Sequence, residues 1–310
     1  MTEMLNGSGK ILLILAGLLV SLLFLRLPLG DTASKFRYIT SIYADDKGLG
    51  LKQPEGVACS GESLLIVADS GNGRLLRYTF KDGAVEIGTV EMKPDQLSYP
   101  IKTEFDSRGE IYVFDRKQRS IVRFSPAGAF RGYLKPAGLP SPATFVPRSF
   151  TIDRNDNIYI LDILSERVLK LDPEGRYVRQ IKFPQEYGFF SDVAVDFKGT
   201  VLLIDGVHGM VFSAEKNSAS FSRLTSSLKE YVRFPASLTT DERGRIYLVD
   251  RNGGSIIILG QDGSFIGRQS GMGWKEGNLN YPAQMCINNK GEVFIADTRN
   301  HRIQIFAVVE

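Results

Sequence analysis

Residues 291–306 read Gly291-Glu-Val-Phe-Ile-Ala-Asp-Thr-Arg-Asn-His-Arg-Ile-Gln-Ile-Phe306, and this stretch is the unit from which the whole chain is built. Apolar residues alternate with others around Val293 and again around Ile303, which is the period of a half-buried strand. Between these two runs, Asp297 opens a polar segment with the composition of a turn. The stretch therefore predicts a strand, an aspartate-led turn and a second strand.

The same pattern occurs five more times upstream. Aligned on the aspartate that ends the first of these strands, the six copies are spaced by 46, 47, 43, 45 and 47 residues. The repeat aspartates are Asp69, Asp115, Asp162, Asp205, Asp250 and Asp297. Short turns such as 107–109 and 242–244 mark a tight hairpin before the aspartate strand, and two further strands follow it. Four strands per unit, with no helical stretch between units, predict an all-β protein with one β-propeller blade per repeat.

The two ends of the repeat region complement each other. Residues 36–43 form a single strand pattern ahead of the first unit, whereas the sixth unit contains only three strands. We expect the N-terminal strand to supply the outer strand of the last blade, because this pairing would close the ring and satisfy an open sheet edge. The predicted domain is a six-bladed propeller over residues 36–310.

Two stretches resemble a known family. Pro282, Gly291 and the run Ala296-Asp-Thr-Arg-Asn-His-Arg-Ile-Gln-Ile-Phe306 resemble the NHL repeat, and Ala68-Asp-Ser-Gly-Asn-Gly-Arg74 matches it in the first unit. The likeness covers about residues 36–310. It implies a six-bladed β-propeller. For the repeat aspartates we expect a structural role, in which the carboxylate accepts turn N–H bonds and pairs with arginine.

Residues 1–35 lie outside the predicted propeller. Lys10 precedes fifteen uncharged residues, 11–25, and an apolar segment continues beyond Arg26 to residue 29. We expect an N-terminal hydrophobic helix that acts as an uncleaved signal-anchor, because no Ala-x-Ala cleavage site follows it. This predicts a single-pass protein of the cell (inner) membrane with an extracytoplasmic propeller. The alternatives are cleavage to a secreted or periplasmic protein and a buried helix of a cytosolic one.

Composition and cysteine content exclude some classes of protein. The net charge of +3 over 310 residues is far below that of a typical nucleic-acid-binding protein, so nucleic acid is not expected as a partner. Cys59 and Cys286 fall at almost matching places in the first and last units, offset by one residue. Because successive residues of a strand point to opposite faces, we expect two buried thiols rather than a bridge.

Candidate binding residues gather in the segments predicted on one face of the ring. The turns after the repeat aspartates and the links between blades emerge on the same face, and loops on a rigid scaffold are common binding sites. An exposed tryptophan, aromatic residues before the inner strands and a basic cluster suggest a protein partner, an envelope polysaccharide or another anionic ligand. Packing over blade tops and a solvated charged edge are the alternatives. The candidates are Trp274, Tyr99, Phe234, Tyr281, Arg116, Lys117, Arg119 and Arg148.

Two enzymatic alternatives require metal-ligating side chains. The amidating lyase whose propeller resembles NHL repeats uses histidines around zinc, but this chain has only His208 and His301, both in the aspartate turns. Lactonase-like propellers hold calcium in the channel, and a comparable site would draw on Glu55, Asp192, Asn288 and Glu104. These four are not equivalent from blade to blade. We therefore expect no catalytic residue and no cofactor, and keep a channel calcium ion in a metal-dependent hydrolase as the alternative.

Overall fold

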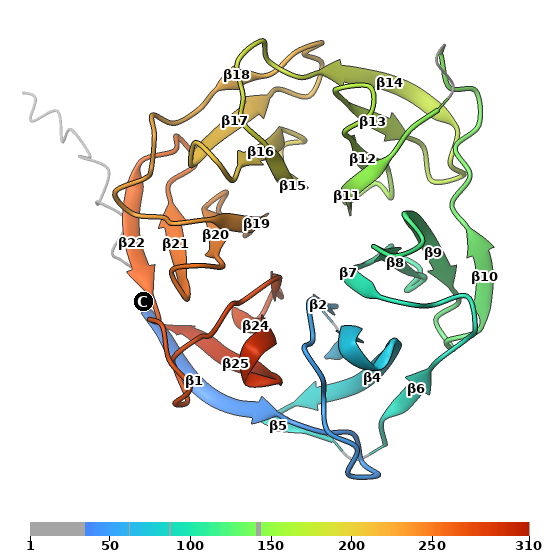
Figure 1. Ribbon diagram of the computed structural model, residues 1–310, viewed down its shortest axis with the longest axis vertical. Coiled ribbons are helices and arrows are strands. Elements are labelled where there is room, and N and C mark those ends of the chain that lie inside the picture. The colour runs from blue at the N-terminus through green and yellow to red at the C-terminus, as the bar shows by residue number, and fades with distance from the viewer. Residues whose placement is uncertain (1–34, 62, 87, 141–143, 310) are drawn as a thin grey trace, which may run out of the picture. The chain divides into compact units, whose positions relative to one another are not determined.

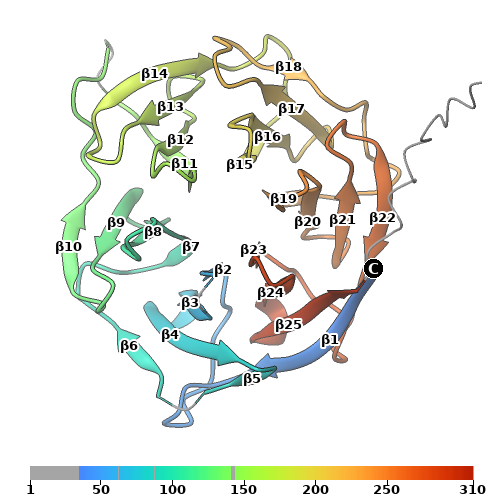
Figure 2. The same cartoon turned by 180° about the vertical axis from the view of Figure 1, so that it is seen from behind.

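In a computed structural model of the protein, the described residues are 35–61, 63–86, 88–140 and 144–309. They form a ring of six antiparallel sheets, which we number as blades 1 to 6 (Figures 1 and 2). This confirms the predicted all-β, six-bladed propeller. The predicted anchor helix, residues 11–29, lies outside the described residues. Neither of the two short helices in the described ranges is long or apolar enough to cross a bilayer.

Each blade runs from an inner strand at the channel to an outer strand at the rim. Blade 1 contains β2 (Gly56–Cys59), β3 (Leu64–Asp69), the one-turn helix η1 (Ser70–Asn72) and β4 (Arg74–Lys81), and its outer edge is shared by β5 (Ala84–Val85) and β6 (Val90–Met92). Blade 2 contains β7 (Pro100–Phe105), β8 (Ile111–Asp115), β9 (Ser120–Phe124) and β10 (Phe130–Tyr133). Blade 3 contains β11 (Pro147–Ile152), β12 (Ile158–Asp162), β13 (Arg167–Leu171) and β14 (Tyr177–Lys182).

The second half of the ring repeats this order. Blade 4 contains β15 (Phe190–Val195), β16 (Val201–Asp205), β17 (Met210–Ala214) and β18 (Ser222–Arg223). Blade 5 contains β19 (Pro235–Thr240), β20 (Ile246–Asp250), β21 (Ser255–Leu259) and β22 (Phe265–Gln269). Blade 6 contains β23 (Met285–Ile287), β24 (Glu292–Asp297), the one-turn helix η2 (Thr298–Asn300), β25 (Arg302–Val309) and the N-terminal β1 (Lys35–Ile42).

The ring closes through pairing of the first and last strands. β1 lies antiparallel to β25, with Lys35 opposite Val309 and Ile42 opposite Ile303 (Figure 1). The ring of Phe36 lies 6.2 Å from that of Tyr247 in blade 5, so β1 also contacts the neighbouring blade. The predicted completion of blade 6 by the N-terminal strand is therefore correct.

The hydrophobic core is divided into six clusters, one between each pair of neighbouring blades. Between blades 6 and 1, for example, Val57, Leu65 and Val67 face Phe294 and Ala296. Alternation along each strand sends one side chain to the preceding blade and the next to the following blade. Apolar residues therefore fill the spaces between blades.

The repeat aspartates fasten the links between blades. All six are buried where the second strand ends. Asp69 Oδ1 accepts the Lys52 N–H at 2.7 Å, and Asp297 Oδ1 accepts the Asn280 N–H at 2.6 Å. The Nε of Arg74 also donates to Asp69 Oδ2 at 2.7 Å. The carboxylate thus ties the segment that enters a blade to the turn between its second and third strands, a charge-assisted arrangement.

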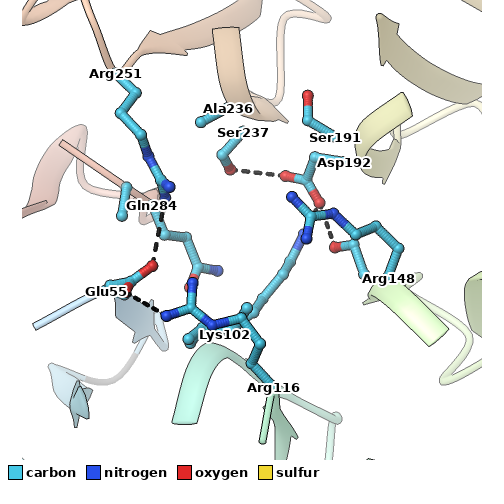
Figure 3. A pocket seen from close by; sticks show the side chains of 13 residues that line it. Glu55, Lys102, Arg116, Arg148, Ser191, Asp192, Ala236, Ser237, Arg251 and Gln284 are labelled. Carbon is cyan, nitrogen blue, oxygen red and sulfur yellow. Dashed lines mark hydrogen bonds and ion pairs between the residues drawn. The ribbon is translucent and has the colours of Figure 1, made fainter. Parts of the chain in front are cut away.

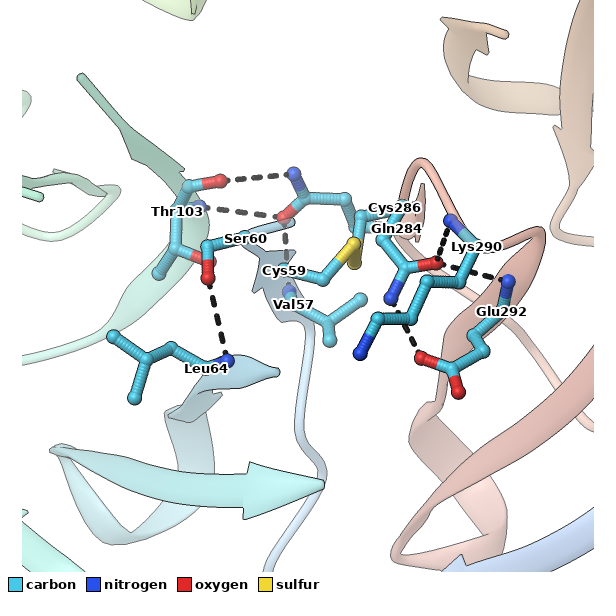
Figure 4. The surroundings of a disulfide bond; sticks show 10 residues. Val57, Cys59, Ser60, Leu64, Thr103, Gln284, Cys286, Lys290 and Glu292 are labelled. Carbon is cyan, nitrogen blue, oxygen red and sulfur yellow. Dashed lines mark hydrogen bonds between the residues drawn. A yellow bond between two sulfur atoms is a disulfide. The ribbon is translucent and has the colours of Figure 1, made fainter. Parts of the chain in front are cut away.

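The prediction of two free thiols was wrong: Cys59 and Cys286 form a disulfide between blades 1 and 6, with their Cα atoms 6.0 Å apart (Figure 4). Both pack against the cluster between these blades. Neighbouring blades bring opposite faces together, so residues of opposite parity meet across the space between them. The one-residue offset, which argued against a bridge, is what directs the two sulfur atoms toward each other.

Candidate functional site

Irregular starts of the inner strands shape the loop-face end of the channel. In blades 2 to 5 the register shifts directly after the first residue of the inner strand, between Pro100 and Lys102 in β7 and between Pro147 and Ser149 in β11, for example. Such a β-bulge re-aims side chains. As a result, consecutive residues such as Arg148 and Ser149 both line the same cavity.

This cavity has a volume of about 60 Å³ and is lined by two layers of side chains from the inner strands. The layer nearer the loops, which we call the mouth ring, consists of Glu55, Ile101, Arg148, Ser191, Ala236 and Ala283. The layer beneath it, the plug ring, consists of Lys102, Ser149, Asp192, Ser237 and Gln284. Arg116 and Arg251, from the turns after repeat aspartates in blades 2 and 5, complete the lining.

Hydrogen bonds hold the plug-ring side chains in place. Asp192 accepts hydrogen bonds from the Lys102 ammonium at 2.5 Å and from the Ser237 hydroxyl at 2.7 Å. It also accepts a hydrogen bond from the Ser149 hydroxyl (Figure 3). Gln284 accepts the backbone N–H of Val57 at 3.1 Å and donates to the Thr103 carbonyl at 3.2 Å (Figure 4). The charges of Lys102 and Asp192 therefore neutralise each other below the mouth.

The mouth carries an excess of positive charge. Glu55 lies between Arg116 and Arg251, with each guanidinium Nη2 3.4 Å from one of its carboxylate oxygens (Figure 3). The Tyr99 hydroxyl donates to Glu55 Oε1 at 3.0 Å. The Arg116 guanidinium also lies over the Tyr99 ring, 4.5 Å from its centroid. Glu55 and Tyr99 thus hold this arginine over the cavity.

Arg148 is the unpaired cation of the site. Its guanidinium makes no hydrogen bond or ion pair with any side chain among the described residues, and its Nε is buried without a partner. It lies over the ring of Phe189, 4.8 Å from the centroid, and points into the cavity (Figure 3). Burial, together with the nearby charges of Arg251 and Arg116, lowers the pKa of Arg148. An uncompensated, partly buried charge is costly, so this position favours an anion.

The structure brings some predicted site residues together and separates others. Arg116 and Arg148 line the cavity, and Tyr99 and Tyr281 support its arginines, with Arg251 5.2 Å from the Tyr281 centroid. The remaining predicted residues do not line it. Trp274 is 78% exposed, Lys117 and Arg119 are exposed on the turn of Arg116, and Phe234 donates its N–H to Asp250.

Besides Lys102, Ser149, Ser237 and Gln284 of the plug ring, the sequence prediction missed Arg251. It directly follows a repeat aspartate, a position occupied by Ser70 in blade 1 and Thr298 in blade 6. There the hydroxyl donates to a carbonyl at the start of the next inner strand, as Ser70 does to Pro100 at 2.6 Å. Arginine at this position departs from that structural pattern in blades 2 and 5. Comparing this one position across the six repeats would have found Arg116 and Arg251 together.

The two carboxylates of the cavity and both histidines already have partners within the protein. Asp192 binds Lys102, and Glu55 lies between two arginines, so both carboxylates already face cations. His208 Nδ1 lies 2.9 Å from Asp205 Oδ2, and His301 Nδ1 accepts the N–H of Gln53. Each imidazole is therefore already hydrogen-bonded within the protein. No group of three His, Cys, Asp or Glu side chains able to hold a metal occurs within the described ranges.

Comparison with known proteins shows which proteins the chain is similar to. Residues 279–306 match the NHL repeat family. The chain is 35% identical over 169 residues to human NHL repeat-containing protein 3, a match that covers 49% of this chain and 46% of that protein. It therefore aligns with less than half of this relative. The comparisons therefore show an NHL repeat in the last blade and similarity to an NHL repeat-containing protein, on a ring of six blades.

Solved structures share the fold at low sequence identity. A gluconolactonase from Xanthomonas campestris, XC5397, superposes with a TM-score of 0.63 at 13% identity, covering 83% of this chain and 86% of that one. A chain of a nidogen/laminin complex superposes with a TM-score of 0.57 at 15% identity, covering 76% and 92%. At such identities the likeness extends to the fold alone, and function has to be argued from the site.

Proposed function

We propose that the protein is a noncatalytic binding scaffold that recognises an anionic partner, an acidic envelope polymer or an acidic protein segment, through its loop face. Arg148 is the observation on which this proposal depends. It projects into the cavity beside two other arginines, and within the described ranges its guanidinium makes no ion pair. A cationic cleft with low-dielectric walls concentrates anionic ligands.

Exposed apolar side chains in the loops support a large partner. Leu164 and Val207, in the turns after the repeat aspartates of blades 3 and 4, are 56% and 49% exposed. Met272 and Trp274, in the link that enters blade 6, are more exposed still. Apolar groups around a polar centre are common at interaction surfaces, where aromatic residues act as anchors.

We also propose that the propeller is extracytoplasmic and tethered through residues 11–29. The Cys59–Cys286 disulfide supports this location, because disulfides persist mainly in oxidising compartments. A lactonase-like activity has less support, since the channel carboxylates that would bind a metal are paired with Lys102, Arg116 and Arg251.

Binding of the purified full chain to immobilised polygalacturonate, with uncharged dextran as reference, tests the scaffold proposal. We expect salt-sensitive binding to the acidic polymer only, and a loss of at least about tenfold in affinity for the double variant Arg148→Gln, Trp274→Ala. Arg154→Gln alters an exposed arginine in the short hairpin turn between β11 and β12, on the opposite face, and should bind like wild type. Equal binding by the double variant would refute the loop face as the binding surface.

A further inference from the structure

The mouth of the channel contains more cationic charge than its own carboxylate can neutralise. Arg116, Arg148 and Arg251 line the cavity, whereas Glu55 is the acidic residue of the mouth ring. The charge of Lys102 beneath them is taken up by Asp192 at 2.5 Å. Because Arg148 and Arg251 are partly withdrawn from water, their positive charge attracts an anion more strongly than an exposed basic patch would.

The contacts of Glu55 leave much of this cationic surface available. Its two oxygens lie 3.4 Å from the guanidinium nitrogens, beyond the roughly 2.7–2.9 Å of a strong charge-assisted bond. Neither Arg116 nor Arg251 has another ion pair in the described part of the chain, and the Arg251 Nε is buried without a hydrogen bond. These arginines can therefore bind a further acceptor without breaking a strong internal contact.

The size of the cavity limits what enters it. The cavity is small, with a volume of about 60 Å³, and the plug-ring side chains form part of its lining. A single carboxylate or phosphate group can occupy it, and the planar guanidinium groups suit such oxyanions.

We infer that the channel mouth binds one small oxyanion, a carboxylate or a phosphate at the end of a larger ligand, with Arg148 as its main contact and Glu55 as a resident competitor. The inference rests on the proposed binding function of the loop face and adds the chemistry of the recognised group. Glu55 competes because its carboxylate occupies Arg116 and Arg251 and repels a second anion.

Calorimetric titration of the purified full chain with sodium acetate and with sodium phosphate, at constant ionic strength set with sodium chloride, tests the inference. We expect about millimolar dissociation constants, as befits ligands of four or five heavy atoms. Arg148→Gln should weaken binding at least about tenfold, because it removes a charged hydrogen-bond donor. Glu55→Gln should strengthen binding about tenfold, because it removes the competing charge and keeps the shape of the side chain.

Lys117→Gln is the matched control, since it removes one positive charge from the exposed side of the Arg116 turn. It should leave both dissociation constants within about twofold of wild type. Tighter binding of acetate would identify a terminal carboxylate as the natural group, and tighter binding of phosphate a phosphate ester. The inference is overturned if neither salt binds, or if Arg148→Gln binds like Lys117→Gln. It is also overturned if Glu55→Gln, with an unchanged circular dichroism spectrum, gains no affinity.

The two proposals fail in different ways. If acetate or phosphate binds and polygalacturonate does not, the oxyanion site is supported and an acidic polymer as partner is not. Polymer binding that depends on Trp274 but not on Arg148 would retain the scaffold and exclude the oxyanion site. Single variants at these two positions, measured in both assays, separate the outcomes.

Discussion

At the scale of single residues, Glu104 shows how the channel sets the pH dependence of stability. It lies on β7, two residues after Lys102, with one carboxylate oxygen 4.0 Å from the Lys102 ammonium. Burial raises the pKa of Glu104 to about 7, the charge of Lys102 opposes this shift, and that of Asp192 adds to it. The folded protein therefore keeps a proton on Glu104 at pH values where the unfolded chain has lost it.

This raised pKa predicts a loss of stability as pH rises. Between about pH 4.5 and pH 7 the folded state binds more protons than the unfolded state, so the free energy of unfolding falls with pH. Glu104→Gln lacks this titration. We expect the variant to match wild type near pH 5 and to exceed it by about 1–3 kcal/mol at pH 8 in urea unfolding.

A difference between Glu104→Gln and wild type that is the same at pH 5 and pH 8 would contradict this assignment. Glu174→Gln serves as the control, because Glu174 is an exposed carboxylate that pairs with Arg176. It should show no such widening of the stability difference across this pH range.

The candidate site could be predicted only in part, because the direction in which a side chain points depends on strand pairing that the sequence does not show. The position of Arg116 after a repeat aspartate was visible in the sequence, but strict alternation does not place both Arg148 and Ser149 at the channel. The register shift that does so depends on the pairing of β11 with β12. The role of Glu55 likewise depends on arginines from blades 2 and 5, which are distant in sequence.

At the scale of strands, the aspartate spacing was sufficient to predict the blades because each repeat contains one complete sheet. The last blade was predictable for a related reason: an unpaired strand pattern at the start and a missing strand at the end complement each other. The disulfide was not predicted, because sequence alignment superimposes equivalent faces of two blades, whereas packing brings opposite faces together. Cys59 and Cys286 lie on opposite faces of their blades and therefore meet in the space between blades 6 and 1.

The pairing of β1 with β25 predicts a large cost of truncation. A chain that begins at Tyr43 lacks β1, which removes the packing of Phe36 and Ile42 and exposes the edge of β25. Loss of a buried Ile side chain alone costs about 2–5 kcal/mol, so we expect a loss of at least about 5 kcal/mol for the strand. We also expect association through the open edge.

Size-exclusion chromatography and thermal unfolding check this prediction, with a chain that begins at Lys35 as the control because it keeps the whole of β1. The control keeps the closed ring and gives the reference stability and elution volume. If the chain that begins at Tyr43 is equally stable and elutes at the same volume, β1 is not needed for closure.

At the scale of the whole molecule, the ring places its apolar clusters between blades and its charges at the axis. Opening the ring between any two blades exposes one of the six clusters, so stability depends on closure. At the join between blades 6 and 1, the β1–β25 pairing acts at the rim and the disulfide acts near the channel. The first acts through native contacts, and the second also restricts the unfolded chain.

The disulfide therefore predicts a redox-dependent stability. It links residues 227 positions apart, and closing so long a loop removes much conformational entropy from the unfolded state. We expect the Cys59→Ser, Cys286→Ser variant to lose about 2–5 kcal/mol of unfolding free energy in guanidinium titrations. Reductant should lower the midpoint of wild type to that of the variant and leave the variant unchanged. Because β1 remains paired with β25 in the variant, its ring should still close, so oxyanion binding at the mouth should persist at low denaturant. Equal midpoints for oxidised wild type and the variant would show that the rim pairing fastens the ring without help from the bridge.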